Sequence, residues 1–341
     1  MNIDVFNGDA DGIFSLIQLR RYAPVATSQQ QLITGVKRDH ALLQTITDAQ
    51  AKDAELWVLD LPFDKNSVAL PRLLQQVRHI HYVDHHFTKS RFHHERLTTV
   101  FDFSPTVCTG LLVSAHLGYQ QHVWALPAAF GDNLFDVAYR DCQALGLSTA
   151  QTEQLRELGM LVNYNSYGAT VADLHMHPAQ LYCQLMAYES PFAVVADNDR
   201  EAPFLLLQQG YVNDREQARN AQNLEHHQTI LAIRLPATAW ARRINGSLAN
   251  ELAQEHPDQA ILIATENMDG KTYSINLRAP QTNRVGAGSI CERYPHGGGR
   301  AGAGGINHLP EHELDGLLRI VSDYYSKGSI GNNEKKPISK R

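Results

Sequence analysis

The chain of 341 residues has no long hydrophobic run. No apolar segment approaches the roughly 20 residues that a membrane-spanning helix needs. The first residues, Met-Asn-Ile-Asp-Val, carry no basic region of the kind that opens a secretory signal. These absences argue against a membrane partner and favour a cytoplasmic protein.

Cysteine is scarce as well. The four cysteines stand far apart and show no paired spacing of the type that zinc sites or disulfide frameworks use. We therefore expect reduced thiols at these positions, which are Cys108, Cys142, Cys183 and Cys291.

Positive charge is also limited, with 30 lysines and arginines against 36 aspartates and glutamates and a formal net charge of −6. Proteins that hold long duplex nucleic acid need many Lys and Arg contacts with its backbone, so this balance argues against such a partner. A small anionic nucleotide stays compatible, because one or two arginines and metal ions are enough to hold it. The length of the chain favours two domains.

The first part of the chain alternates strand-like and helix-like segments. This alternation indicates βαβ units and a mostly parallel sheet. From about residue 105 the pattern becomes helical, which indicates a helical layer that completes an α/β domain over residues 1–190. The expected strands are residues 3–6, 32–36, 55–60 and 79–83, and the expected helices are 13–22, 40–47, 68–77, 106–117, 127–139, 151–162 and 178–187.

The second part of the chain indicates a smaller α/β domain over residues 237–326. We interpret residues 191–236 as a connector that is helical in part, and residues 327–341 as a disordered tail. The elements expected in the second domain are helices 247–255, 286–293 and 311–325, strands 260–265 and 272–277, and a glycine-rich stretch at 296–305.

Acidic clusters follow three of the expected strands. Asp9 and Asp11 come after the first, Asp60 ends the third, and Asp84 precedes two histidines after the fourth. Ligands bind at the carboxyl ends of the strands in such sheets. Two cations about 3.5–4 Å apart, held by carboxylates, can activate water for phosphoryl transfer. Any single aspartate is better explained by a turn or a helix cap, but the set favours a metal site.

Mixed ligands refine this prediction. Aspartate combined with histidine suits Mn²⁺ better than Mg²⁺ alone, because imidazole is a softer donor. The predicted ligand set is Asp9, Asp11, Asp60, His85 and Asp132.

The same residues form motifs that resemble those of the DHH phosphoesterase superfamily. The motifs are Asp-Ala-Asp-Gly at 9–12, Leu-Asp at 59–60, Val-Asp-His-His at 83–86 and Gly-Asp at 131–132, in the family's order. The stretch Gly-Gly-Gly-Arg-Ala-Gly-Ala-Gly-Gly at 297–305 resembles the signature of the DHHA1 domain. The resemblance covers nearly the whole chain apart from the tail. It implies a parallel-sheet DHH metal domain followed by a DHHA1 domain that selects the substrate.

The resemblance also implies a role for each residue. Asp9 would bind a first metal ion and Asp11 a second, with Asp60 bridging the two. His85 and Asp132 would complete the second site.

Beside these ligands, His86 would face the substrate phosphate, either orienting it or protonating the leaving oxygen. Asp84 would hold the histidines from behind. The plain alternative for His86 is a histidine packed in the core.

Three positions depart from the family pattern. Many members carry His where this chain has Val5, and the exonuclease branch carries Asp where it has Asn7. Asn7 is the poorer ligand, so the first metal site is expected to be weaker here, or completed by water or the Asn7 oxygen. Arg300 stands where the family motif has His, and an arginine offers a bidentate fork to phosphate. Its alternative is a solvated surface arginine.

The glycine-rich stretch is expected to bind substrate. Gly297, Gly298 and Gly299 leave backbone N–H groups open to an anion, and Arg278 is a second candidate for phosphate binding. The alternative for the glycines is a flexible linker.

These expectations lead to a Mn²⁺-dependent phosphodiesterase with two ions, for which Mg²⁺ or Co²⁺ could substitute. Its substrates would be linear dinucleotides such as pGpG, from cyclic dinucleotide signalling, or nanoRNA, cut to mononucleotides. Three alternatives stay open: a single-strand 5′ exonuclease, a nucleotide phosphomonoesterase acting on pAp-type substrates, and a non-catalytic nucleotide-binding sensor. A homodimer is compatible with the sequence.

Overall fold

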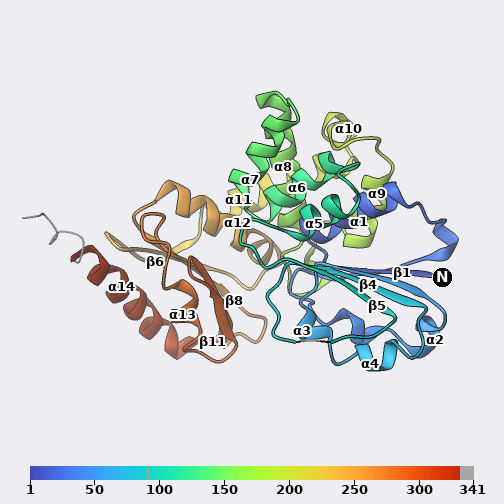
Figure 1. Cartoon of the computed structure of the whole chain (residues 1–341). Coiled ribbons are helices and arrows are strands. Elements are labelled where there is room, and N and C mark those ends of the chain that lie inside the picture. The colour runs from blue at the N-terminus through green and yellow to red at the C-terminus, as the bar shows by residue number, and fades with distance from the viewer. Residues whose placement is uncertain (91, 331–341) are drawn as a thin grey trace, which may run out of the picture. The chain divides into compact units, whose positions relative to one another are not determined.

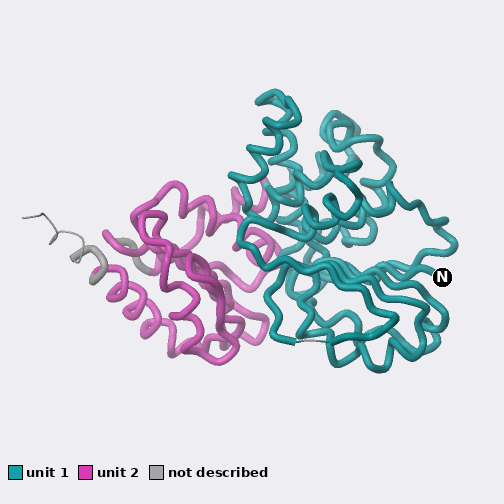
Figure 2. Tube along the Cα trace, viewed as in Figure 1, with its two compact units in different colours: residues 1–211 teal, residues 212–341 magenta. Residues whose placement is uncertain are grey.

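The computed structural model describes residues 1–90 and 92–330. The chain divides into two compact units, Met1–Tyr211 and the residues from Val212 on (Figure 2). The division falls within helix α11, Pro203–Ala218. Each unit has its own sheet and its own hydrophobic core.

A five-stranded sheet forms the centre of the first unit, with the strand order β2-β1-β3-β4-β5 (Figure 1). All neighbouring strands are parallel, as predicted. Parallel strands need crossover connections, which the intervening helical segments supply. The strands are β1 Asn2–Phe6, β2 Gln30–Ile33, β3 Glu55–Leu59, β4 His79–Asp84 and β5 Leu97–Phe101.

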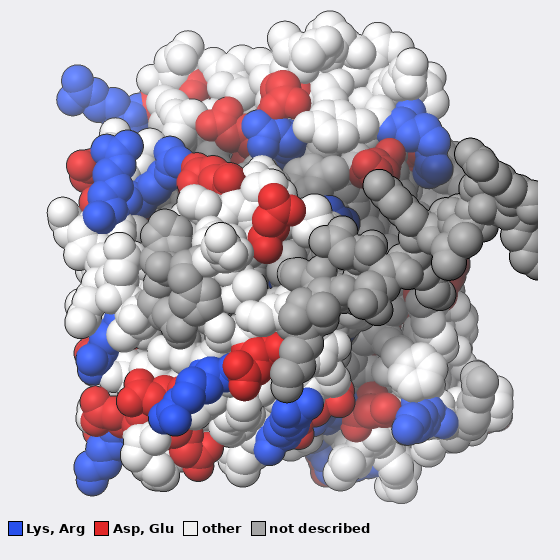
Figure 3. Space-filling model, turned by 90° about the vertical axis from the view of Figure 1, so that its left-hand side faces the viewer, with Lys and Arg blue, Asp and Glu red and all other residues white. Residues whose placement is uncertain are grey.

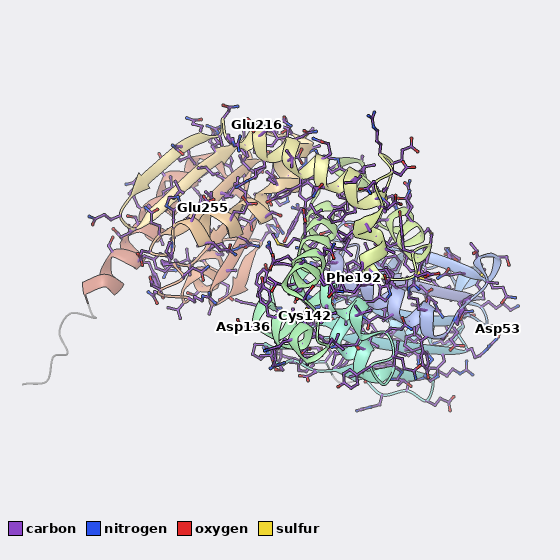
Figure 4. The ribbon with its side chains drawn as sticks, turned by 90° about the horizontal axis from the view of Figure 1, so that it is seen from above. Asp53, Asp136, Cys142, Phe192, Glu216 and Glu255 are labelled. Atoms are coloured by element: carbon purple, nitrogen blue, oxygen red, sulfur yellow. The ribbon has the colours of Figure 1, made fainter. Side chains whose placement is uncertain are left out.

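Helices cover both faces of this sheet, which explains why its central strands are apolar on both sides. Cys142 of α7 lies in the larger helical layer and Phe192 of α10 packs against it (Figure 4). The smaller layer consists of α2 Asp48–Ala51, α3 Phe63–Asn66 and α4 Leu70–Leu73. The larger layer contains α1 Ala10–Tyr22, α5 Thr109–His116, α6 His122–Gly131, α7 Phe135–Ala144, α8 Thr149–Asn165, α9 Pro178–Met186 and α10 Pro191–Ala196.

The predicted helix over residues 127–139 is two helices. Helix α6 ends at Gly131 and α7 begins at Phe135. Asn133 between them has a left-handed backbone, with φ at 61°, which a continuous right-handed helix cannot contain. The break places Asp132 directly after the last residue of α6.

Other boundaries in the first unit differ as well. The expected helix 68–77 shortens to the single turn of α4, which has a proline in its first turn. The expected helix 40–47 is a 3-10 turn at Leu42–Thr45 followed by α2. Strand β5 has no counterpart in the prediction.

The second unit is built on a six-stranded sheet with the order β10-β11-β9-β8-β7-β6. Strands β7 and β8 are parallel, and every other pair is antiparallel. Helices α13 and α14 pack on one face of the sheet, and α12 packs on the other. The elements are β6 Gln222–His227, β7 Ile230–Leu235, α12 Ala239–Glu255, β8 Ala260–Glu266, β9 Thr272–Arg278, α13 Ala287–Cys291, β10 Gly297–Arg300, β11 Ala303–Pro310 and α14 Leu314–Ile330.

This unit begins before the expected domain at residues 237–326. The expected connector at 191–236 contains α10, α11 and two strands of the second sheet. Residues 214–227 are polar, and only those up to Ala218 are helical, because β6 begins at Gln222. The apolar residues of β7 form a largely buried strand.

The ends of two helices are corrected too. Helix α12 begins at Ala239 after Thr238, and not at Ser247. Helix α14 continues to Ile330, so the first residues of the expected tail are helical, and residues 331–341 lie outside the described residues. Within the described part of the chain, no helix is long and apolar enough to cross a membrane.

Candidate metal centre

The carboxyl ends of β1, β3 and β4 bring the predicted residues of the first unit together. Asp9 follows β1 and caps helix α1, where its Oδ1 accepts a hydrogen bond from the Gly12 N–H at 3.1 Å. Asp60 follows β3, and His85 follows β4. Because these strands are neighbours in a parallel sheet, their ends lie at one edge, as the sequence predicts.

Helix α5 holds Asp11 from the other side. Both carboxylate oxygens of Asp11 accept backbone hydrogen bonds at the start of α5, from Thr109 N–H at 2.8 Å and from Gly110 N–H at 2.7 Å. The Thr109 hydroxyl also donates to Asp60 Oδ1 at 3.1 Å. Thr109 and Gly110 therefore orient two candidate ligands. The sequence pattern does not mark either residue, because only the fold brings α5 to this edge.

His85 presents a ligand atom to three carboxylates. Its Nδ1 lies 3.0 Å from the Val107 carbonyl oxygen. A carbonyl only accepts, so Nδ1 is the donor in this contact, and Nε2 is the ring nitrogen that faces the carboxylates. Nε2 lies 3.6 Å from Asp60 Oδ1, 3.8 Å from Asp11 Oδ2 and 3.8 Å from Asp132 Oδ2.

The distances from His85 Nε2 to the three carboxylate oxygens suit ligands of a shared cation better than direct hydrogen bonds. All three are too long for hydrogen bonds. An octahedral divalent ion holds oxygen ligands at about 2.1 Å, which sets neighbouring ligand atoms about 3 Å apart, so a small contraction would suffice. Asp132 Oδ2 is buried and has no hydrogen-bond partner among the described residues. A cation between these four side chains would satisfy that atom.

The charges of the carboxylates also favour a cation in this position. Burial raises the pKa of Asp60 well above its usual value, and the charges of Asp11 and Asp9 raise it further. Burial also raises the pKa of Asp132, with a further contribution from Asp11. Buried acids that repel one another gain from a nearby positive charge.

His86 is held by Asp84. Its Nδ1 lies 2.7 Å from Asp84 Oδ1, and the imidazole is 29% exposed. Burial on its own would lower the pKa of His86, but the hydrogen bond and the charge of Asp84 raise it above the usual value. Ligand atoms of Asp60, His85 and His86 lie within 4.8 Å of one another, so His86 is a further candidate ligand.

The position beside Asp9 is different, because Lys37 fills it. The Lys37 ammonium forms an ion pair with Asp9 Oδ2 and donates to Asn163 Oδ1 at 3.1 Å. Burial would lower the pKa of Lys37, but the attraction of Asp9 outweighs it and the pKa is raised. The pKa of Asp9 is lowered despite its burial, chiefly by the charge of Lys37.

Asn7 lies beside the loop that carries Lys37. Its Nδ2 lies 3.4 Å from the Lys37 carbonyl oxygen, and its Oδ1 is buried without a partner among the described residues. Val5 lies in the core on the opposite face of the sheet. The sequence identifies this position as a departure from the family pattern, but it does not reveal Lys37, which follows β2 and lies 28 residues from Asp9 in the chain.

The remaining predicted residues belong to the second unit. Arg278 ends β9, and its guanidinium donates from Nε to Asn250 Oδ1 at 2.8 Å and from Nη1 to Asn276 Oδ1 at 3.3 Å. Arg300 is exposed at the end of the edge strand β10. The glycines at 297–299 lie in this same strand, which removes the linker interpretation.

Two of these glycines have a packing role that the sequence does not indicate. A Cβ at Gly297 would lie 2.0 Å from the carbonyl oxygen of Cys291 in α13. At Gly299, where φ is 151°, it would lie 2.3 Å from the Ala303 carbonyl oxygen. A Cβ at Gly298 would meet nothing within 4 Å. Close packing of α13 and β11 therefore explains Gly297 and Gly299, and Gly298 lacks this explanation.

A parallel α/β unit with a carboxylate and histidine centre at its strand ends defines the class of this protein. No family model matches the chain, and no curated protein matches it. Solved structures do. The DHH domain of a member of a family of ribosomal proteins has a TM-score of 0.63 at 13% identity, over 96% of this chain and 86% of that one.

Two further structures extend the comparison. Exonuclease RecJ bound to manganese has a TM-score of 0.55 at 14% identity, over 96% of this chain and 90% of that one. The pGpG-specific phosphodiesterase of Vibrio cholerae has a TM-score of 0.53 at 12% identity, over 96% of this chain and 99% of that one. The chain thus has the fold of DHH-family proteins along nearly its whole length.

Proposed function

We propose that this protein is a metal-dependent phosphodiesterase that cuts short 5′-phosphorylated nucleotides to mononucleotides. The observation that carries the proposal is the convergence of Asp11, Asp60 and Asp132 on Nε2 of His85, at distances of 3.6–3.8 Å. The manganese-bound exonuclease and the pGpG-specific phosphodiesterase among the structural neighbours support it. Linear dinucleotides such as pGpG are the proposed substrates.

Each side chain of the centre has a proposed task. Asp11, Asp60, His85 and Asp132 hold a Mn²⁺ or Mg²⁺ ion. When bound, such an ion activates water and polarises a phosphate oxygen. Thr109 keeps Asp60 in place through its hydroxyl.

A proton for the leaving oxygen would come from His86. Asp84 is fully buried and holds His86 by the hydrogen bond at Nδ1. The opposite ring nitrogen, Nε2, is then the atom that would carry a proton to the leaving oxygen. Because Asp84 raises the pKa of His86, the imidazole stays protonated to a higher pH than an isolated one.

Exposed aromatic rings favour a nucleotide over a phosphate chain without bases. Phe87 follows His86 directly and is 69% exposed, and its ring centroid lies 5.6 Å from that of Phe103, which is 38% exposed. Nucleobases stack on exposed aromatic rings. We propose Phe87 as a stacking surface. Within the second unit, considered by itself, Arg278, Gly298 and Arg300 stay candidates for phosphate binding.

The test is hydrolysis of 5′-phosphorylated dinucleotides by the full chain with Mn²⁺. We expect pGpG to yield mononucleotides, and Asp60→Asn and His85→Gln each to lower kcat/KM by at least about 100-fold. His81→Gln is the matched control, because His81 lies on β4, the strand that His85 follows, but its ring stacks on Trp57 with centroids 4.2 Å apart.

Two results would contradict the proposal. One is wild-type protein that cuts no dinucleotide, and the other is an Asp60→Asn variant that works as well as the wild type. Release of inorganic phosphate from pAp, without cleavage of dinucleotides, would instead identify a phosphomonoesterase.

One observation favours a non-catalytic nucleotide-binding protein as a second candidate. Lys37 pairs with Asp9 where the resemblance places a first metal ion. Nucleotide binding without turnover, with Mn²⁺ present, would support that candidate.

A further inference from the structure

We infer that the Lys37 ammonium is a permanent cation of this centre, taking the place of one metal ion beside Asp9, so that the chain binds a single divalent ion. The inference rests on the proposed function for its chemistry. It changes the predicted pair of ions to one ion and one lysine, and it assigns a role to a residue outside the DHH motifs.

The first support is that Lys37 is held in place from several sides. Its backbone N–H donates to the Ser166 carbonyl oxygen at 3.0 Å, and its own carbonyl oxygen accepts from Asn7 Nδ2 at 3.4 Å. Its ammonium lies between Asp9, the amide oxygen of Asn163 and the ring of Tyr167, whose centroid is 5.8 Å away.

The loop that carries Lys37 is packed tightly against the Asp9 turn. A Cβ on Gly8 would lie 1.9 Å from the Gly35 carbonyl oxygen, so the two backbones touch. Asp39 closes the loop by accepting from the Val36 N–H at 2.9 Å. The backbone of Lys37 is therefore held beside the Asp9 turn, and its side chain, which is 31% exposed, reaches Asp9 from there.

The second support is the ligand set beside Asp9. Asp9 Oδ1 accepts the capping hydrogen bond from Gly12, and Oδ2 binds the ammonium. Asn7 is neutral and Val5 is apolar, so Asp9 is the one carboxylate that the motifs assign to this half alone. One carboxylate paired with one ammonium has no charge left for a divalent ion, which the ammonium would repel.

The other half has the opposite balance. Asp11, Asp60 and Asp132 surround His85 Nε2, and no lysine or arginine ion pair to any of these three carboxylates is present among the described residues. Three carboxylates and an imidazole make a complete site for one divalent ion. The asymmetry between the two halves predicts one ion in the half that contains His85.

The test is a calorimetric titration of the metal-free full chain with Mn²⁺, together with the electron paramagnetic resonance spectrum of the loaded protein. We expect one bound ion and the spectrum of an isolated Mn²⁺ for the wild type and for Lys37→Arg. We expect two ions and a spin-coupled spectrum for Lys37→Met, which keeps a chain of similar length without charge. Lys52→Met, at an exposed position, is the control for loss of one positive charge.

Each other outcome is decisive. Two ions in the wild type would overturn the inference, and so would one ion in both the wild type and Lys37→Met. Circular dichroism checks that Lys37→Met folds, and if it does not, a second ion in the wild type remains the result that overturns the inference. Binding of one ion without hydrolysis would sustain the inference while rejecting the phosphodiesterase, and hydrolysis with two ions would do the reverse.

Discussion

Asp60 shows how a single residue sets both the shape and the charge of the centre. Its backbone is left-handed, with φ at 58°, and its side chain is buried. Aspartate and asparagine tolerate this conformation better than other residues with a Cβ. Asp60→Asn therefore removes the charge and keeps the turn, which makes it a cleaner test of metal binding than replacement by alanine.

A second residue-scale prediction concerns His122 at the start of α6. Its imidazole lies 2.9 Å from Ser114 Oγ and 3.6 Å from Asp141, and burial lowers its pKa despite the attraction of Asp141. The pKa in the unfolded chain is about 6.5, so the unfolded chain takes up the proton first as the pH falls. Stability is therefore lost as the pH drops through that value toward the lower folded pKa.

The variant His122→Gln keeps a polar side chain and removes this titration. Between about pH 7.5 and about pH 5.5 we expect the wild type to lose more stability than the variant. Urea unfolding of both proteins at the two pH values measures the difference. Parallel losses of stability would show that His122 does not contribute.

Some residues of the site could be predicted from the sequence, and others could not. The strand-end acids and His85 follow from motifs and from the rule that parallel strands end at one edge. Lys37 and Asn163 do not, because their contact joins residues 126 positions apart, and its existence depends on how a loop packs against a helix. A lysine in a loop looks in sequence like any solvated surface charge.

At the scale of elements, the centre depends on close packing of α6, which carries Asp132 at its end. Helix α8 approaches it at Gly159, where a Cβ would lie 2.1 Å from the Pro127 carbonyl oxygen. Alanine gains about 1 kcal/mol over glycine in helix propensity. A rigid backbone carbonyl cannot move aside as a side chain would. We therefore expect the cost of this clash to exceed the gain in helix propensity.

We expect Gly159→Ala to destabilise the protein by about 1–3 kcal/mol in urea unfolding. Gly316→Ala is the control, because Gly316 is also helical but has nothing within 4 Å of its Cβ position, and here a gain of about 0.5–1 kcal/mol is expected. If both variants were stabilised, the close approach of α6 and α8 would not be what requires glycine.

Helices and strands can be predicted from the sequence where the local pattern of apolar residues is strong. The helices and strands that carry long apolar periods agree with the sequence, as α1 and β3 do. Strand β5 has two exposed threonines at its centre and lies at the edge of its sheet, so its pattern is weak. Strand β6 is polar, and only its pairing with β7 makes it a strand.

At the scale of the whole molecule, charge of both signs is mixed. Figure 3 shows lysines and arginines interspersed with aspartates and glutamates on the face that it draws. In the second unit, Arg243 pairs with Asp214 at 2.8 Å and Arg234 with Glu266 at 2.8 Å. Together with the net charge of −6, these pairs leave little positive charge to follow a long backbone.

From this charge balance we expect dinucleotides, and not long single strands, to be the better substrates. A processive grip on single strands gives log K a slope of about −0.7 per phosphate contact against log salt, so many contacts make a steep dependence. With few basic contacts, we expect kcat/KM to be highest for dinucleotides and to fall as a 5′-phosphorylated oligonucleotide lengthens to about ten nucleotides, with a shallow salt dependence at every length.

A length series of one repeated sequence, measured with Mn²⁺ at several salt concentrations, tests this expectation. Hydrolysis of a 3′-labelled strand shows whether cleavage starts at the 5′ end. A value of kcat/KM that rises with length and falls steeply with salt would identify a 5′ exonuclease. Such a result would place the grip on basic residues such as Arg278 and Arg300, whose replacement by alanine would then flatten the salt dependence by about one phosphate contact each.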